Sequence, residues 1–362
     1  MLTKFYKYFF LPAAIFQSVI IGGGYATGRE IVEYITNNNP TGGLVSLAVI
    51  TITFSILMST SFVFAKTFEK SDYRGFLIAL LGRFWLAYEV CFLLLLIIII
   101  AVVCSAASQT IFNTFGISPS YTLLSTVVLI VGFSFLGRTF IEKSLSCWTV
   151  VILLSALAFF FATGSHNNIH KTLNSSVEIH ALTSIKSGFL FALYNSALIP
   201  VLIYSVNYIP NTKIAAYSGI FTGIMGALPA FLLHFSLMGD FPEITGIDVP
   251  VYWKLNQLSL ISAKYIYVAA LFGTLILTAV GILRGVSDRI NGWLVEKNRE
   301  PLNKKYECLL TGSIILSSLM LSQIGIIALV SKGYGLLGWA FFFIFTVPLV
   351  SVGIYKIYSK TK

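Results

Sequence analysis

Charged side chains are scarce in this chain. Asp, Glu, Lys and Arg make up 10% of its 362 residues, compared with about 25% in soluble domains. With 14 acids and 24 bases, the chain has too little charge to cover a water-facing surface, whereas a lipid-facing surface needs none. The composition therefore excludes a soluble globule. Because 57% of the residues are hydrophobic, it predicts an all-α integral membrane protein.

Patterns that bind metals or catalyse reactions are missing too. The four cysteines lie in or beside apolar segments, so they indicate neither a disulfide framework nor a zinc site. His166 and His170 have a metal-compatible spacing but no third ligand nearby, and the glycine run at Gly22 lacks the signature of a phosphate loop. We therefore expect no enzyme, no catalytic residues, no metal site and no cofactor, apart from a coupling Na+ or H+.

What the chain does have is long apolar runs, and each bilayer crossing needs roughly 20 such residues. Ten runs recur, bounded by charged residues, Pro, Asn or Gly. They predict ten transmembrane helices, at Phe5–Gly22 continuing broken to Tyr34, Gly43–Phe68, Phe84–Phe115, Tyr121–Gly137, Phe140–Thr163, Ser184–Tyr208, Ile214–Met238, Leu258–Leu294, Tyr306–Val330 and Tyr334–Tyr355.

The positive charges predict the orientation. Most of the 24 bases fall on the cytoplasmic side if the N-terminus lies inside, as the positive-inside rule requires. An even number of spans then places both termini in the cytoplasm of a bacterium, with the chain in the inner membrane. Since the bases lie in short loops between apolar runs, the net charge of +10 does not indicate a nucleic-acid partner.

A polar connection at residues 164–183 divides the single membrane domain into two halves, 1–163 and 184–362. Each half has five predicted spans, and an odd number reverses the orientation of the second half. The pattern predicts a 5+5 inverted repeat with an exterior linker between the halves. Inverted repeats are typical of secondary transporters, in which corresponding helices of each half are broken at the binding site.

The first span carries one candidate break, at Gly22, Gly23 and Gly24, followed by Tyr25 and Thr27. Each glycine costs a helix about 1 kcal/mol relative to alanine, so we expect the backbone to unwind here and its N–H and C=O groups to bind a solute. Close helix packing is the alternative explanation for such small residues.

The first span of the second half carries the other candidate break, at Tyr194, Asn195 and Ser196, with Pro200 one turn later. Proline removes a backbone donor, which helps to free the preceding carbonyl groups. These polar side chains are the second part of the predicted substrate site, unless they only join neighbouring helices by hydrogen bonds.

Three ionisable residues follow the first break. Intramembrane charge indicates function by default, so Glu30 is a candidate for binding a coupled proton or a substrate amine. Arg29 and Glu33 are four residues apart and predict a gate that closes by pairing these two side chains. The sequence leaves open whether Arg29 pairs with Glu30 or with Glu33.

At these residues the sequence resembles the YkvI-like membrane proteins, a bacterial group within the amino acid/polyamine/organocation transporter assemblage, which shares the LeuT-type fold. The resemblance rests on Gly22-Gly23-Gly24-Tyr25-Ala26-Thr27-Gly28-Arg29-Glu30 and on Tyr194-Asn195. The segment Phe140-Ile141-Glu142-Lys143-Ser144 is similar to the start of the fifth helix of neurotransmitter:sodium symporters.

The resemblance implies broken first and sixth helices with a small zwitterion or cation held between them. It also implies a sodium site built from backbone at Ser18 and Ile21 and from the hydroxyls of Thr274 and Thr278. A second hydroxyl usually stands beside the last of these, but Leu277 and Ala279 flank Thr278 here. Proton coupling and uncoupled transport therefore stay open beside sodium coupling.

Together these features predict a secondary transporter that moves a small amino acid or amine-like solute across the lipid bilayer by alternating access. The alternative is a ligand-sensing membrane protein, like a germinant-receptor subunit, that binds a solute without moving it. The sequence names neither the solute nor the oligomeric state.

Overall fold

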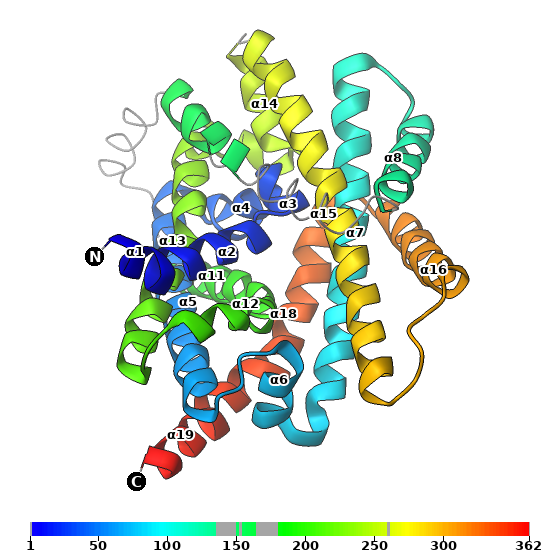
Figure 1. Ribbon diagram of the computed structural model, residues 1–362. Helices are drawn as coiled ribbons and strands as arrows, with labels where there is room; N and C mark the ends of the chain where they lie inside the picture. The colour runs from blue at the N-terminus through cyan, green and yellow to red at the C-terminus, as the bar shows by residue number, and fades with distance from the viewer. Residues whose placement is uncertain (1, 135–149, 152–153, 164–179, 259–260, 362) are drawn as a thin grey trace.

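The computed structural model describes residues 2–134, 150–151, 154–163, 180–258 and 261–361. All regular elements in these ranges are helices (Figure 1). This confirms the all-α class for the part of the chain that the structure covers. The predicted Phe140 segment, His166, His170 and most of the linker lie outside the described residues.

The elements before residue 135 include the predicted broken first span and three long helices. They are α1 (Leu2–Phe5), η1 (Tyr6–Phe10), α2 (Leu11–Ile20), α3 (Gly23–Ala26), α4 (Arg29–Tyr34), η2 (Thr36–Asn38), α5 (Asn39–Phe68), α6 (Tyr73–Leu81), η3 (Gly82–Phe84), α7 (Trp85–Phe115) and α8 (Pro119–Ser134).

The elements after residue 180 repeat this mixture of broken and continuous helices. They are α11 (Ala181–Ser196), α12 (Ile199–Leu202), η4 (Ile203–Tyr208), α13 (Thr212–Leu237), η5 (Met238–Asp240), η6 (Glu243–Gly246), α14 (Pro250–Gln257), α15 (Ile261–Glu296), α16 (Lys304–Ser322), α17 (Ile326–Ala328), η7 (Leu329–Tyr334), α18 (Gly335–Phe341), η8 (Phe342–Thr346), η9 (Leu349–Gly353) and α19 (Ile354–Thr361).

Several of these helices are long and apolar enough to cross a membrane. Within the described residues there are five, and a sixth if the bent pair Ala181–Ser196 and Ile199–Tyr208 counts as one span. The chain is therefore a multi-pass membrane protein, while the ten-span inverted repeat stays a prediction. The five are Arg29–Phe68, Tyr73–Phe115, Thr212–Asp240, Lys264–Glu296 and Ile326–Lys360.

Small residues let α5 and α13 approach closely. A Cβ atom on Gly219 or Gly223 would overlap the backbone of α5 at Ser59 or Ser55, so only glycine fits at these two positions. Without a hydrophobic driving force inside a bilayer, helices associate through such close packing. The helix α13 of this pair also packs against α2. Gln17 of α2 donates a 2.6 Å hydrogen bond to the carbonyl of Met225 in α13.

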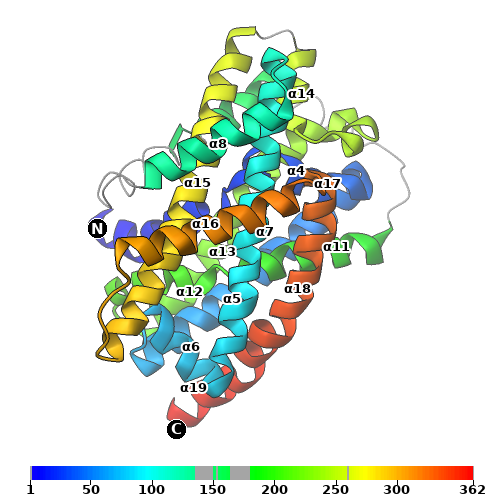
Figure 2. The same ribbon diagram turned by 90° about the vertical axis from the view of Figure 1, so that its right-hand side faces the viewer.

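The long helices α7 and α15 lie side by side, and α16 crosses their outer face (Figures 1 and 2). The helix α14 lies at one end of the bundle, whereas α6, α19 and the C-terminus lie at the opposite end. We call these the α14 end and the C-terminal end. The broken elements α2–α4 and α11–α12 lie between the two ends.

Candidate functional site

The first span is broken twice, on either side of a short helical turn. Ile21 and Gly22 leave the helical path after α2, and Gly28 adopts a left-handed φ of 83° before α4. Contrary to the expectation, Gly23, Gly24 and Tyr25 are not unwound, since they form α3. The chain leaves the helical path at the two ends of that turn, and only the second end, at Gly28, uses a backbone conformation that favours glycine.

Thr27 stabilises the second of these breaks. Its hydroxyl donates a 2.8 Å hydrogen bond to the carbonyl of Gly24 and accepts a 3.2 Å bond from the backbone N–H of Arg29. The Thr27 side chain is buried. Both of its hydrogen bonds hold the break itself.

The second broken span bends by 47° between α11 and η4. The break lies at Ala197 and Leu198, two residues later than predicted, because Pro200 fits the first turn of α12. Asn195 and Ser196 bond to carbonyls of their own helix, at 3.0 Å and 2.6 Å. Tyr194 in the last turn of α11 instead directs its hydroxyl out of the helix.

Glu30 is the point at which the two broken spans meet. Its carboxylate accepts a 2.6 Å hydrogen bond from the Tyr194 hydroxyl and another from the backbone N–H of Tyr25. A Cβ on Gly24 would overlap this carboxylate, so a larger residue there would have to displace the Glu30 side chain. The Tyr194 ring stacks on that of Tyr334, with centroids 4.8 Å apart. Glu30 itself is 5% exposed.

A cavity of about 350 Å³ opens beside this pair. It runs from the breaks along α7 and α15 to Arg289, whose guanidinium contacts α6 at the C-terminal end. Seven predicted site residues line it, namely Ser18, Ile21, Gly22, Glu30, Tyr194, Asn195 and Thr278. The other eight are not among its lining residues, namely Gly23, Gly24, Tyr25, Thr27, Ser196, Thr274, Arg29 and Glu33.

The residues of the implied sodium site are only partly together. Ser18, Ile21 and Thr278 share the cavity wall, and the Thr278 methyl lies 3.6 Å from where a Cβ on Gly22 would stand. Thr274 is buried, and its hydroxyl donates a 2.8 Å bond to Ala270 in its own helix. Of the two threonines, only Thr278 therefore lines the cavity beside the break.

Arg29 turns away from the cavity and is 1% exposed. Its guanidinium pairs with Glu33 at 2.5 Å and donates to the carbonyls of Thr245 and Ile247, at 2.8 Å and 3.0 Å. The partner of Arg29 is therefore Glu33, and Glu30 points elsewhere. Burial raises the pKa of the Asp248 carboxyl in the same loop, although the charge of Arg29 acts in the opposite direction.

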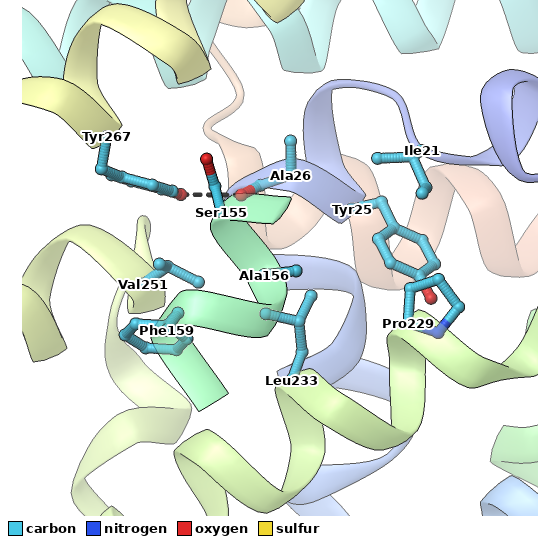
Figure 3. A pocket seen from close by; sticks show the side chains of 10 residues that line it. All are labelled: Ile21, Tyr25, Ala26, Ser155, Ala156, Phe159, Pro229, Leu233, Val251 and Tyr267. Atoms are coloured by element: carbon cyan, nitrogen blue, oxygen red, sulfur yellow. Dashed lines mark hydrogen bonds between the residues drawn. The ribbon is translucent and has the colours of Figure 1, made fainter. Parts of the chain in front are cut away.

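The broken first span is closely packed on its side toward the α14 end, at Ala26 and Thr27. The Tyr267 hydroxyl donates a 2.7 Å bond to the carbonyl of Ala26, and the Val251 N–H donates a 3.2 Å bond to Thr27. Figure 3 shows the Tyr267 contact beside a small apolar cavity of about 20 Å³, which the Tyr25 ring also lines. The large cavity therefore lies on the opposite side of the break.

The cavity residues that sequence reasoning missed include Phe92, Arg289 and Tyr334. Arg289 was expected only as one more cytoplasmic base. The helical spacing of Thr278, Gly281, Gly285 and Arg289 was a visible signal, because these positions share one face of α15. Glu89 of α7 lies 3.6 Å from Arg289.

No protein-family model matches the chain. The uncharacterized membrane protein YkvI of Bacillus subtilis (strain 168) is 22% identical over 332 residues, which cover 90% of this chain and 91% of that protein. A Na+-coupled sialic acid symporter, solved in a substrate-bound outward-open state, matches with a TM-score of 0.62 at 12% identity, over 94% of this chain and 78% of its own. A mutant of the Eremococcus coleocola manganese transporter matches with a TM-score of 0.48 at 12% identity, over 93% and 84%.

The match to YkvI, a membrane protein, extends over nearly the whole chain. At 12% identity and a TM-score of 0.62, the likeness to the symporter concerns the fold. This chain therefore shares the fold of that symporter, with a cavity lined by both of its broken spans.

Proposed function

We propose that the protein is a secondary transporter that moves a small amino acid or amine-like solute across the membrane by alternating access. The observation that carries this proposal is the buried Glu30 carboxylate, which lines a cavity where two broken helices meet. The proposal includes the ten-span 5+5 inverted repeat, and a bacterial inner-membrane location with both termini in the cytoplasm.

The charge of Glu30 supports a cation site. No Lys, Arg or His in the described part of the chain forms an ion pair with it, since the neighbouring Arg29 pairs with Glu33. A buried carboxylate without a counter-charge is costly. A proton, a metal cation or the amine of a solute relieves this cost, and each of them can enter through the cavity.

The walls of the cavity suit an amine with an apolar body. The rings of Phe92, Tyr194 and Tyr334 line it together with aliphatic side chains of α7 and α15. Aromatic faces attract cations, and the attraction strengthens where water is excluded. Pockets that are mostly apolar with a few placed polar groups are typical of small-molecule sites.

The contacts at the two ends support alternating access. The α14 end is closed by the bonds of Tyr267 and Arg29, whereas the cavity extends from the break toward the C-terminal end. A transporter that exposes one central site to each side in turn needs such an asymmetry. The α14 segment would have to leave Ala26 and Thr27 for the cavity to open on its other side.

The test is uptake into proteoliposomes that contain the purified chain, with a panel of labelled amino acids and amines and with the external pH varied. We expect counterflow of at least one solute, and we expect Glu30→Gln to remove its pH dependence or to lower its affinity. Glu243→Gln is the control, because Glu243 is exposed in η6 and does not line the cavity.

Three outcomes separate the alternatives. Solute binding without flux in wild-type protein would replace transport by the sensing function. An unchanged affinity and an unchanged pH profile in folded Glu30→Gln would remove Glu30 from the mechanism. If the pH dependence disappears while affinity is kept, Glu30 carries the coupled proton and does not pair with the solute.

A further inference from the structure

The cavity has a second charged group at the end away from Glu30. Arg289 lines it on the same face of α15 as Thr278, Gly281 and Gly285. From Thr278, which lies beside the first break, to Arg289 the helix rises about 16 Å at 1.5 Å per residue. The single acid and the single base among the described lining residues therefore stand at opposite ends of one cavity.

Aromatic rings hold the Arg289 guanidinium in place. The Phe92 ring centre lies 4.4 Å and the Tyr73 ring centre 4.9 Å from its central carbon. Cation–π contacts of this kind fix the plane of a guanidinium without using its N–H groups. The donors of Arg289 are therefore not consumed by these rings.

Only one nitrogen atom of the guanidinium has partners among the described residues. Nη1 donates a 3.3 Å bond to the Tyr73 hydroxyl and lies 3.6 Å from Glu89. Within the same residues the hydrogen bond and the ion pair of Arg289 both use Nη1, and neither uses Nε or Nη2. Nη2 lies 4.0 Å from where a Cβ on Gly285 would stand, so it faces the glycine side of α15 that lines the cavity.

The Nε and Nη2 donors of arginine form a planar fork that matches the two oxygen atoms of a carboxylate. Glu89 does not occupy this fork, because its contact at 3.6 Å is with Nη1. The Arg29–Glu33 pair in α4 is closer, because Nη2 of Arg29 lies 2.5 Å from a carboxylate oxygen of Glu33. The two arginines therefore differ in what faces the cavity. Arg29 lies away from it, with Nη1 and Nη2 both bonded to protein and a buried Nε. Nη2 of Arg289 is on the cavity side and has no partner among the described residues.

We propose that Arg289 is a second substrate station, which binds the carboxylate of a solute between the C-terminal end and the site at Glu30. The inference rests on the proposed transport function and narrows its substrate class to carboxylate-bearing solutes such as amino acids, in place of simple amines. Because about 16 Å separates the two stations along the helix, a small amino acid occupies them in succession.

The test measures binding to the purified full-length protein by thermal shift. The probes are the proteinogenic L-amino acids, the matching amino acid amides, which lack the carboxylate, and inorganic phosphate. We expect at least one amino acid to raise the melting temperature more than its amide does. Arg289→Gln should lower the affinity for that amino acid at least tenfold and leave the affinity for the amide unchanged.

Arg284→Gln is the matched control, because Arg284 lies on the same helix, pairs with Asp288 and does not line the cavity. Arg289→Lys keeps the charge but loses the fork, so it should resemble Arg289→Gln. Glu89→Gln tests whether Arg289 binds a solute carboxylate or only forms a structural ion pair with Glu89. Loss of a competing acid should strengthen amino acid binding, whereas a purely structural pair predicts that Glu89→Gln weakens it as Arg289→Gln does.

Three results would overturn the inference. They are equal affinity of wild-type protein for acids and amides, stabilisation by inorganic phosphate alone, and no stabilisation by any carboxylate probe. Its failure is distinguishable from failure of the proposed function. Flux of amines without carboxylate binding would reject only the Arg289 station, whereas carboxylate binding that depends on Arg289 without any flux would reject only transport.

Discussion

The Tyr194 hydroxyl donates a 2.6 Å hydrogen bond to the Glu30 carboxylate, across 164 positions of the chain. Glu30 lies in the first turn of α4, after the broken part of the first span, and Tyr194 lies in the last turn of α11, before the break at Ala197 and Leu198. A hydrogen bond to a buried carboxylate is among the stronger ones in proteins. This bond joins the two broken spans at the cavity, so a substitution at either residue should change the position of the other side chain.

Removing the Tyr194 hydroxyl should weaken solute binding. Hydrogen bonds to charged groups contribute about 1.5–3 kcal/mol, so Tyr194→Phe should lower the affinity about tenfold or more. The measurement is a binding isotherm with a solute found in the uptake screen. Tyr34→Phe is the control, because the buried Tyr34 hydroxyl bonds to the carbonyl of Val330 at 2.8 Å. Equal losses in the two variants would contradict a specific role for Tyr194.

Two neighbouring glycines should respond very differently to alanine. A Cβ on Gly24 would overlap the Glu30 carboxylate, whereas a Cβ on Gly22 would stand at an ordinary 3.6 Å from Thr278. Gly24→Ala should therefore displace Glu30 and abolish binding or reduce it strongly, while Gly22→Ala should bind nearly as wild type.

Both glycine variants should insert and fold, because the other spans are unchanged. The comparison is affinity against melting temperature for each purified variant. Wild-type affinity in a folded Gly24→Ala protein would show that the carboxylate does not need its present position.

Local signals in the sequence were enough to find the two breaks. Glycines mark the first one, and Pro200 marks the second, because both residue types act on their own backbone. The same signals placed Glu30 and Tyr194 in the candidate site before their contact was known. The breaks were displaced by a few residues, since a single turn at Gly23–Ala26 gains helical bonds that glycine propensity alone does not count.

Partners that come from distant segments could not be predicted. The carbonyls of Thr245 and Ile247, which lie more than 200 residues away along the chain, accept hydrogen bonds from Arg29. No local sequence pattern predicts these contacts. Counting the bases on each side of the membrane treats Arg289 as a cytoplasmic base, because the count takes no account of the helices against which α15 packs. Its place in the cavity depends on how α15 packs against α6 and α7, which is a property of the tertiary structure.

The Arg29 cluster should control the closure of the α14 end. Arg29 has three partners and is buried, so Arg29→Gln leaves Glu33 and two carbonyls without their donor. Removing one partner of a buried pair costs about 3–5 kcal/mol, and we expect the lower end here because Glu33 is 18% exposed.

Hydrogen exchange is the measurement for this cluster, and the backbone amides of residues 241–249 should exchange faster in Arg29→Gln. Lys254→Gln is the control, because Lys254 pairs with Asp240 near the same loop but does not contact the break. Unchanged exchange in Arg29→Gln would show that Tyr267 and Val251 close this end without Arg29. Because the partner of Arg29 is Glu33, a charge swap should restore closure only between these two residues.

The last prediction concerns sodium, and it follows from Thr278, which lines the cavity without Thr274. Sodium prefers several oxygen ligands, but Thr278 stands between Leu277 and Ala279, and Thr274 is not among the cavity-lining residues. Replacing sodium by choline should therefore change the solute affinity by less than about tenfold, or 1.4 kcal/mol. The measurement is the same binding isotherm in matched sodium and choline buffers.

Two threonine variants decide whether a sodium site exists after all. If sodium loss lowers affinity by more than tenfold in wild-type protein and Thr278→Val removes that difference, the implied site is intact and coupling is to sodium. Thr274→Val is the control, because its hydroxyl bonds within α15 and should leave the sodium response unchanged. A weak sodium response together with a pH dependence that Glu30→Gln abolishes would assign the coupling to a proton on Glu30, the one cavity-lining acid among the described residues.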